Sequence, residues 1–396
     1  STAPAASLVV DSRLSGENAR RILKRDSKPY LFRPITLRSV TARNRIMLSP
    51  MCQYSATDGL SNDWHFVHLG ARAVGGAGIV FTEAVHVEAR GRITPYCLGL
   101  WNDEQRYRLA RIAAFVEQQG AVPGIQLGHA GRKASVGRPW EGTLPISATE
   151  GGWDVISASD LPYAHGWPKP IPMSRNDIAE SIDLLVRSVI RARDAGFRIV
   201  EIHAAHGYLF HQFLSPLSNI RSDSYGGSFE GRVRFLLESI EAVRGVWPDD
   251  LPLFLRLSVT DWVDGGWSES ESVQLARILA KKREIDLIDC TSGGNDPRQQ
   301  PPPLDRPCQQ IPVHPGYQVP LAHSIKSASG LATAAVGLIH SADLAESIVA
   351  NAQADLVVLG RALMADPVWP LRAANTLRAA NVTWPVQYER SNIFGP

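Results

Sequence analysis

The chain has few cysteines and no long hydrophobic run, and these two absences exclude several classes of protein. Its 396 residues include 4 cysteines and no Cys-x-x-Cys pair, which argues against a zinc ribbon, a thioredoxin-type site and a disulfide framework. No apolar stretch approaches the roughly 20 residues that a membrane-spanning helix needs. The N-terminus also lacks the apolar core and the small-residue cleavage site of a signal peptide. We therefore expect a protein of the reducing cytoplasm that is neither secreted nor embedded in a membrane.

An excess of one charge sign is also missing. The 41 basic and 39 acidic residues leave a net charge of +2, and because they are spread along the chain, no basic face gathers a phosphate backbone. We therefore do not expect nucleic acid as a partner. With 44% hydrophobic and 20% charged residues, the composition is that of an ordinary globular protein with a large core.

The beginning of the chain differs from the rest. It is rich in Ala and Ser and then in basic residues around Ile22 and Leu23. We expect residues 1–30 to be an extension outside a single domain of residues 31–396. A transit peptide is the alternative, but Asp11, Glu17 and Asp26 argue against it, since such peptides are poor in acidic residues.

Eight short apolar runs follow, mostly of β-branched and aliphatic residues, as expected for parallel strands that are buried on both faces. They are Arg45 to Ser49, Gly78 to Thr82, Val122 to Leu127, Ile199 to His203, Leu253 to Leu257, Ile285 to Cys290, Ala332 to Val336 and Leu356 to Gly360. Helical patterns lie between them, at Asp103 to Gln119, Ser174 to Ala195, Ser228 to Val246, Ser268 to Lys282, Ser341 to Asn351 and Asp366 to Leu377.

Eight strand-then-helix units predict a (β/α)₈ barrel, the TIM-barrel fold. A doubly wound sheet is the alternative, but no Gly-x-Gly-x-x-Gly turn follows the first strand. Two long connections, Gly128 to Met173 and the proline-rich Ser292 to Gly316, would leave the C-terminal ends of strands, where barrels carry their active sites. We interpret both as substrate lids. The segment Phe32 to Asn44 is predicted to be a hairpin that plugs the opposite end.

The segment His203-Ala204-Ala205-His206-Gly207-Tyr208 carries the densest chemistry of the chain. Two imidazoles can hydrogen-bond a carbonyl or nitro oxygen, and a phenol close by can supply a proton, which suits reduction of an activated double bond. His-x-x-His is also a metal-ligand spacing, and two satisfied core histidines are the third possibility. The segment alone leaves these three open.

The ends of the other predicted strands decide between them. A metal-dependent hydrolase needs further His and Asp ligands, but Glu83 has no clear partner, and a Ser/His/Asp triad lacks a nucleophile elbow. Gly337 and Gly360-Arg361 follow the last two strands, where barrels commonly bind phosphate. An FMN could then lie across the barrel, with Gln126 at its pyrimidine ring and Arg256 stabilising the negative charge of the reduced form.

With these residues in place, the chain resembles the Old Yellow Enzyme family of FMN-dependent ene-reductases over Leu31 to Arg390. The motifs that carry the resemblance occur in order: Asn44-Arg45-Ile46, Ser49-Pro50-Met51-Cys52-Gln53-Tyr54, Gly124 to Lys133, Glu201 to Tyr208, Phe213-Leu214-Ser215-Pro216, Ser218-Asn219 and Tyr225-Gly226-Gly227-Ser228. Cys52 with Tyr54 is similar to the branch called thermophilic-like. Gly231, where the family usually has asparagine, and His314, often aromatic in relatives, depart from the pattern.

The resemblance implies roles for individual residues. FMN would contact Ser49, Pro50, Met51, Cys52, Ala84, Gln126, Arg256, Gly337, Gly360 and Arg361. Substrate would contact Tyr54, His203, His206, Tyr208 and Arg390, with Tyr208 as proton donor and no metal. Lys133 belongs to a motif but receives no chemical role. Arg390, in Gln387-Tyr388-Glu389-Arg390, would reach a neighbouring subunit's active site, so a homodimer, or a homotetramer made of two dimers, is implied.

The expected activity is therefore that NADPH or NADH reduces FMN, which passes hydride to the β-carbon of an α,β-unsaturated carbonyl or nitro compound. The small-molecule partner is an activated alkene. Two alternatives are a related flavin barrel that acts on a pyrimidine or a tRNA base, and a non-catalytic FMN-binding or interaction barrel.

Overall fold

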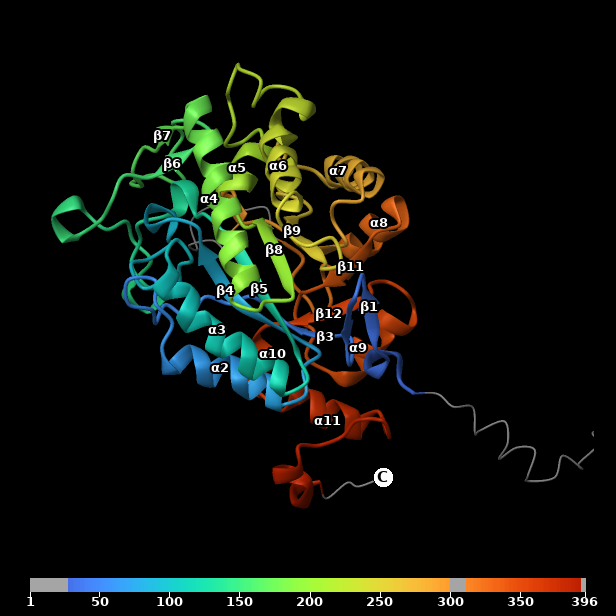
Figure 1. Cartoon of the computed structure of the whole chain (residues 1–396). Helices are drawn as coiled ribbons and strands as arrows, with labels where there is room; N and C mark the ends of the chain where they lie inside the picture. The colour runs from blue at the N-terminus through green and yellow to red at the C-terminus, as the bar shows by residue number, and fades with distance from the viewer. Residues whose placement is uncertain (1–27, 300–310, 393–396) are drawn as a thin grey trace, which may run out of the picture.

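Eight parallel strands close into a barrel in the computed structural model, which describes residues 28–299 and 311–392 (Figure 1). The strands are β3 (Ile46–Leu48), β4 (Ile79–His86), β5 (Val122–Gly128), β8 (Ile199–Ala204), β9 (Leu253–Ser258), β10 (Leu287–Thr291), β11 (Ala332–Ala335) and β12 (Leu356–Leu359). They pair in the order in which the chain makes them, and β12 closes onto β3. Each predicted run overlaps one strand, so the predicted (β/α)₈ barrel is confirmed.

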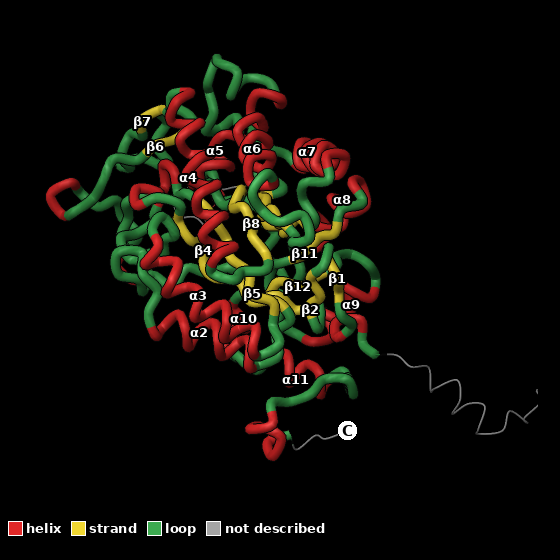
Figure 2. The backbone as a smooth tube through the Cα atoms, in the orientation of Figure 1, coloured by secondary structure: helices red, strands yellow, loops and turns green. Residues whose placement is uncertain are grey.

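Helices surround the strands, as the tube view shows (Figure 2). They are α2 (Asp63–Val74), α3 (Asp103–Gln118), α4 (Arg175–Asp194), α5 (Leu209–Leu214), α6 (Phe229–Arg244), α7 (Glu269–Lys282), α8 (Val319–Ser329), α9 (Ala342–Ala350), α10 (Arg361–Ala365) and α11 (Trp369–Thr376). The six predicted helices correspond to α3, α4, α6, α7, α9 and α11. The last begins at Trp369 instead of Asp366, because Asp366 ends α10 and its carboxylate accepts a hydrogen bond from Val368 N (3.1 Å).

Side-chain caps explain why the predicted helix starts were nearly right. At α7, Ser268 Oγ accepts from Glu271 N, and the Glu271 carboxylate accepts from Ser268 N (3.0 Å), so two otherwise unpaired N–H groups are satisfied. Ser174, Ser228 and Ser341 cap α4, α6 and α9 through their side chains. The serines therefore set where these helices begin.

A two-stranded hairpin, β1 (Ile35–Leu37) and β2 (Val40–Ala42), closes one end of the barrel. Its turn bonds to residues that lead into strands: Ser39 N donates to Asp250 O (3.0 Å) before β9, and Arg38 Nε lies 2.6 Å from Asp286 Oδ1 before β10. The hairpin predicted between Phe32 and Asn44 thus lies at the N-terminal ends of the strands. The C-terminal ends are left for a site.

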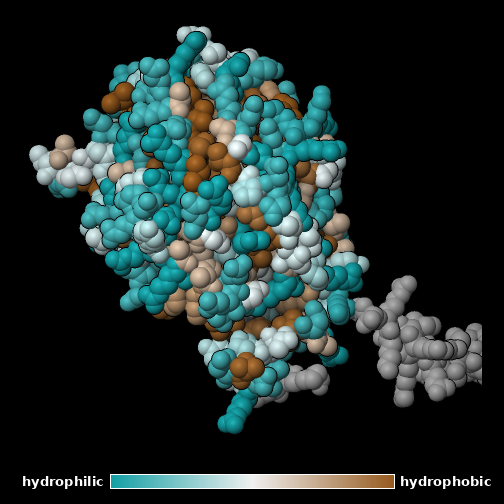
Figure 3. All heavy atoms as spheres, in the orientation of Figure 1, coloured by the Kyte–Doolittle hydropathy of each residue, from teal (hydrophilic) through white to brown (hydrophobic). Residues whose placement is uncertain are grey.

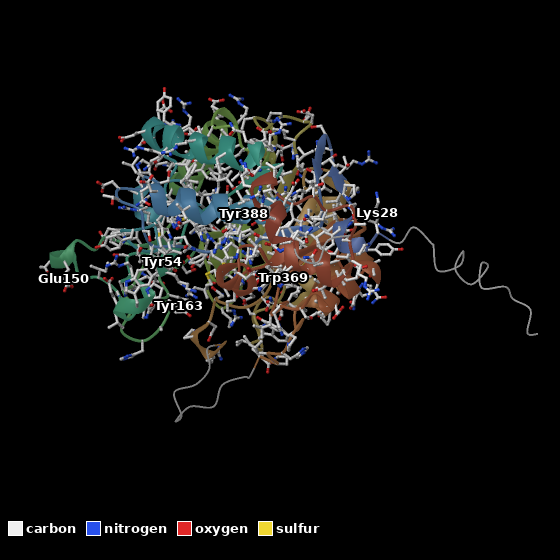
Figure 4. The ribbon with its side chains drawn as sticks, turned by 90° about the horizontal axis from the view of Figure 1, so that it is seen from below. Lys28, Tyr54, Glu150, Tyr163, Trp369 and Tyr388 are labelled. Atoms are coloured by element: carbon white, nitrogen blue, oxygen red, sulfur yellow. The ribbon has the colours of Figure 1, made fainter. Side chains whose placement is uncertain are left out.

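The connection from β5 to α4 carries its own small core. It contains the 3₁₀ helices η3 (Gly131–Lys133), η4 (Pro139–Glu141) and η5 (Ala148–Glu150) and the strands β6 (Ile156–Ser157) and β7 (Ile171–Pro172). Its tip, with Glu150, projects from the molecule (Figure 4). Under it lies a cluster separate from the main core, which we call the lid cluster: Ile93, Cys97, Ala130, Ala134, Val136 and Val155, with Cys52, Tyr54, Trp153, Trp167 and Tyr208 packed against it.

The surface in Figure 3 is mostly hydrophilic, and apolar side chains show mainly between helices, near α4 and α5. Across residues 28–299 and 311–392, we find no helix with the length and apolarity needed to cross a membrane. Most of the predicted extension (residues 1–27), the proline-rich stretch (300–310) and residues 393–396 lie outside the described residues.

Candidate active site

Three rings meet where β8 ends. The ring centroids of His203 and His206 lie 5.2 Å apart, those of His203 and Tyr208 5.0 Å, and those of His206 and Tyr208 6.5 Å, and each pair is nearly perpendicular. His203 is the last but one residue of β8, and the other two lie in the turn that follows. The predicted constellation is therefore assembled in one place.

The turn after β8 is held in an unusual backbone conformation. His206 has a φ of 59°, in the left-handed region that non-glycine residues seldom occupy. Its N–H donates to Ser258 Oγ (3.0 Å), and its carbonyl oxygen accepts from Lys133 Nζ (2.8 Å). The same ammonium donates to Gly294 O (2.8 Å), which ties the turn to the loop after β10. Lys133 thus receives a structural role that its sequence motif did not reveal.

Burial fixes the protonation of the three rings. It lowers the pKa of His203 and of His206 well below the ordinary value, and the nearby Arg256 guanidinium lowers both further. Burial raises the pKa of the Tyr208 phenol well above its ordinary value. At neutral pH the two imidazoles are therefore uncharged hydrogen-bond partners, and the phenol holds its proton.

Four polar side chains line the barrel interior beside these rings. Gln126 Nε2 donates to Glu201 Oε1 (2.8 Å), and Arg256 Nε lies 3.2 Å from Asp289 Oδ2. Arg256 Nη2 also donates to Ser49 Oγ (3.3 Å). Glu201 and Asp289 are 0% exposed, so this is a charged group inside a dry barrel. Three members of this group, Ser49 after β3, Gln126 in β5 and Arg256 in β9, are residues that the sequence predicted for the FMN site.

Several atoms of this interior group lack a hydrogen-bond partner among the described residues. They are Glu201 Oε2 and Asp289 Oδ1, whereas Arg256 Nε and Asp289 Oδ2 form no hydrogen bond within the described ranges but face each other in the ion pair. A buried polar atom without a partner costs about 1–3 kcal/mol. These atoms are buried, so they lie beneath the surface that a ligand can reach.

A pocket of about 300 Å³ lies beyond this group, at the ends of β11 and β12. Gly337, Gly360 and Arg361 line it, together with Tyr317 and Gln318. A Cβ on Gly337 would lie 3.1 Å from the Tyr317 ring, and its φ of 130° also favours glycine. The predicted phosphate-binding residues therefore share one cavity, in which Arg361 is exposed.

The predicted residues after β3 form the wall under the β5 to α4 connection. Cys52 and Tyr54 are half-buried and pack against the lid cluster together with Tyr208. The Tyr54 ring contacts that of Trp140 edge-on, with centroids 6.0 Å apart, and Figure 4 shows Tyr54 and Tyr163 on the side of the molecule that bears the projecting tip. Ala84 is buried in β4. Pro50 and Met51 are half-buried beside them.

One further expectation was wrong. Glu83 does have a partner, because its Oε1 lies 3.2 Å from His65 Nε2 and its Oε2 accepts from Gln53 N (3.3 Å). Arg390 lies in the 3₁₀ helix η7 (Val386–Ser391), an exposed segment beyond α11 (Figure 1). Within the described ranges, no group of three or more His, Cys, Asp or Glu residues could hold a metal ion.

Residues 30–380 match the NADH:flavin oxidoreductase / NADH oxidase family. The chain belongs to this family. It is 44% identical over 366 residues to the NADPH dehydrogenase of Geobacillus sp. (strain WCH70), covering 92% of this chain and 99% of that one. It is 41% identical over 362 residues to the NADPH dehydrogenase of Bacillus subtilis (strain 168), covering 91% and 98%. The resemblance to Old Yellow Enzymes is thereby confirmed.

Solved structures agree with this membership of the NADH:flavin oxidoreductase family. Morphinone reductase in complex with tetrahydroNAD superimposes with a TM-score of 0.71 at 25% identity, over 89% of this chain and 91% of that one. A 2-naphthoyl-CoA reductase complex gives 0.78 at 26% identity, over 90% of this chain and 53% of that one. The chain is an oxidoreductase, with FMN as cofactor and a nicotinamide nucleotide as hydride donor.

The described residues fit FMN. The cavity at Gly337 and Gly360 suits a phosphate, because glycine lets the backbone approach an anion closely. Gln126 and Arg256, which are 1% and 4% exposed, supply an amide and a guanidinium that suit a polar ring system. Glu201, Asp289 and Thr291, which complete this site, were not among the predicted site residues. A charged residue inside an otherwise apolar strand was the signal that could have revealed the first two.

Proposed function

We propose that the chain is an ene-reductase that reduces alkenes conjugated to a carbonyl or nitro group. The observation that carries this proposal is the meeting of two neutral imidazoles and a protonated phenol at the open end of a flavin-binding barrel. We assign FMN contacts to Ser49, Pro50, Met51, Cys52, Ala84, Gln126, Arg256, Gly337, Gly360 and Arg361. When bound, FMN accepts hydride from NADPH or NADH and supplies it to the β-carbon of the alkene.

The two imidazoles hold the electron-withdrawing oxygen of the substrate. Ala205 N donates to His203 Nδ1 (3.2 Å), so the ring proton of the neutral imidazole sits on Nε2, which donates to the oxygen. His206 Nε2 shares a hydrogen bond with Thr291 Oγ1 (3.0 Å). The Thr291 hydroxyl can donate to this ring or to Gln318 Oε1 (3.4 Å), and when it donates to the ring, the His206 proton stays on Nδ1 and serves the same oxygen. Both bonds strengthen as negative charge develops there.

Tyr208 supplies the proton that the α-carbon requires. Its ring lies 5.0 Å from that of His203, so an oxygen held by the imidazoles places the alkene near the phenol. Its raised pKa keeps the proton on the phenol until a strongly basic carbon forms. Tyr54 and the lid cluster exclude water from this side.

Replacement of Tyr208 by Phe separates the two halves of the reaction. We expect FMN reduction by NADPH to continue at a rate close to that of the wild type, while reoxidation by cyclohexenone or maleimide slows about 10²–10⁴-fold, the usual contribution of a general acid. Stopped-flow absorbance of the flavin measures both rates.

Tyr163→Phe is the matched control, because Tyr163 is a second buried phenol near Lys133, whose ammonium lies 4.7 Å from the Tyr163 ring. It should leave both rates nearly unchanged. Equal slowing of both half-reactions by Tyr208→Phe would contradict the assigned role. A protein that NADPH bleaches but no activated alkene recolours would favour a pyrimidine or a tRNA base as substrate, and one that takes up FMN but is not bleached would be a non-catalytic barrel.

We also propose a homodimer, alone or paired into a tetramer, in which Arg390 enters the neighbouring active site and contacts substrate there. In support, η7 has no buried residue, and Val386 and Tyr388 in it are 71% and 42% exposed. Figure 3 shows an apolar side chain on this projecting C-terminal segment. Such a patch is typical of an interface.

Mixed subunits test this arrangement. Arg390→Ala and Tyr208→Phe should each be weak alone. Heterodimers made by mixing them combine an intact Tyr208 with the partner's intact Arg390 in one site, so part of the activity should return. Absence of recovery in verified heterodimers would exclude the shared site.

The free thiols of the chain bear on the cell compartment in which the protein works. Cys52, Cys97 and Cys290 are free thiols, as in proteins of reducing compartments. We propose a cytoplasmic location, where the nicotinamide donor is available, and cell fractionation tests it.

A further inference from the structure

The barrel interior holds more carboxyl groups than cations. Glu201 on β8 and Asp289 on β10 are both 0% exposed, and Arg256 on β9, 4% exposed, is the cation between them. An unpaired ionised carboxylate in such surroundings is so costly that the group takes up a proton instead. Since one guanidinium can balance one carboxylate, one of the two acids must be neutral.

The neighbours of the two acids differ. Asp289 stands beside Arg256 in the strand register, and Arg256 Nε lies 3.2 Å from its Oδ2. Glu201 stands beside Gln126 in the register, and its Oε1 accepts from the neutral amide of Gln126 (2.8 Å). Its other oxygen, Oε2, has no hydrogen-bond partner among the described residues. The ion pair belongs to Asp289, and Glu201 has the environment of an uncharged acid.

We propose that Glu201 is a neutral, protonated acid that positions the Gln126 amide, while ionised Asp289 offsets part of the charge of Arg256. The inference goes beyond the proposed alkene reduction, since it concerns the cofactor side of the site and needs no substrate. Glu201 acts through Gln126 and is a positioning residue.

The positioning follows from hydrogen-bond chemistry. With its proton on Oε2, Glu201 keeps Oε1 as the acceptor of the Gln126 NH₂, which leaves the Gln126 carbonyl oxygen to accept from the cofactor. The pKa directions agree: burial raises the pKa of Glu201, and the charge of Asp289 raises it further. Burial raises the pKa of Asp289 too, and the Arg256 guanidinium opposes the rise of both pKa values, so the difference between the two acids is the charge of Asp289, which acts on Glu201.

Infrared spectroscopy of the FMN-loaded enzyme tests the protonation directly. At about pH 7 we expect the carbonyl stretch of a protonated carboxylic acid, and Glu201→Gln should remove that band. Glu83→Gln is the matched control, since Glu83 is another buried carboxyl beside the site, and the Glu201 band should survive it. A Glu201→Gln spectrum that has lost only carboxylate bands would overturn the proposal.

The affinities for oxidised and reduced FMN give a second readout. Glu201→Gln replaces a neutral acid by a neutral amide of the same shape, so the ratio of the two dissociation constants should change less than twofold. Glu201→Leu removes the acceptor of Gln126 and should weaken FMN binding roughly fivefold, the value of one hydrogen bond. Failure of Glu201→Gln to fold or to bind FMN would count against the proposal, because neither size nor charge has changed.

The double variant Glu201→Gln with Asp289→Asn leaves Arg256 without a counter-charge. We expect it to favour reduced FMN over oxidised FMN at least tenfold more than the wild type does, a shift of about 30 mV for a two-electron couple. A tenfold shift already in Glu201→Gln alone would mean that Glu201 is ionised. Because these measurements use only FMN, an enzyme that binds FMN but does not reduce alkenes would refute the proposed function and leave this inference intact.

Discussion

Two arginine–aspartate ion pairs form at β10, and their aspartates, Asp286 and Asp289, are three residues apart in the sequence. The two pairs differ in exposure and in role. Asp286, before the strand, pairs with Arg38 of the hairpin at the closed end, where the side chains are 24% and 16% exposed. Asp289, inside the strand, pairs with Arg256 beneath the active site, where they are 5% and 0% exposed. The first pair fastens a plug in contact with water, and the second holds charge in a dry interior.

The difference shows how the barrel divides its tasks. An exposed pair contributes about 0–1 kcal/mol and is screened by salt, whereas a buried pair pays a large desolvation cost and is strongly destabilising to break. The closed end therefore uses its charges for assembly. Apolar residues of the same shape could replace the buried pair at the open end without loss of stability. The charges are kept there because the chemistry of the active site needs them.

The largest effect is expected from Arg256→Met. Removing the guanidinium leaves the Asp289 carboxylate buried without a counter-charge, so the free energy of unfolding should fall by about 3–5 kcal/mol. Urea unfolding measures it. The double variant with Asp289→Leu should recover much of the loss, and a loss below about 1 kcal/mol would place this pair in the class of the exposed one.

A smaller effect is expected from His86→Gln at the open end. Burial, together with His129 and Arg92, lowers the pKa of the buried His86 to about 3, so below pH 6.5 the unfolded chain binds a proton that the folded chain does not. Wild-type stability should therefore fall as the pH drops from about 7 to about 5, and the variant should escape roughly 2 kcal/mol of that fall. Urea unfolding at both pH values, with FMN in excess, checks this. Parallel pH profiles would refute it.

The smallest effect is expected from Arg38→Met at the closed end. Arg38 pairs with Asp286 and also donates to the backbone oxygens of Asp249 and Arg283, yet in contact with water the whole set should contribute no more than about 1 kcal/mol. The loss should shrink in about 1 M salt. A loss as large as that of Arg256→Met would erase the contrast between the two ends.

Local signals in the sequence predicted most of the fold. Apolar runs of β-branched residues located the strands, and Ser174, Ser228, Ser268 and Ser341 marked helix starts through bonds made within three residues. The helix α8 was not predicted, because it begins without a side-chain cap that would mark its start. The helix α2 begins at an Asn62 cap whose partner at the third position is His65, not the usual Glu or Gln.

The site was predictable where its residues adjoin in sequence or follow the ends of predicted strands, as Gly337 and Gly360 do. His203, His206 and Tyr208 share one turn, so their grouping followed from the strand that precedes them. Lys133 could not be interpreted, because its two acceptors belong to loops after β8 and β10 that meet only in the folded barrel. Glu201 was hidden for a related reason: its state depends on how many cations face it across the strands.

The lid cluster has a consequence for how such enzymes diversify. Its side chains form a group separate from the main barrel core, and Ala130, Ala134, Val136 and Val155 of this group come from the segment between β5 and α4. Mutations of these side chains remodel the wall over Tyr208 without replacing the apolar residues of the main core. Descendants of one barrel can therefore change substrates by drift in the lid cluster, while Lys133 and Ile156 of the same segment keep it joined to the barrel.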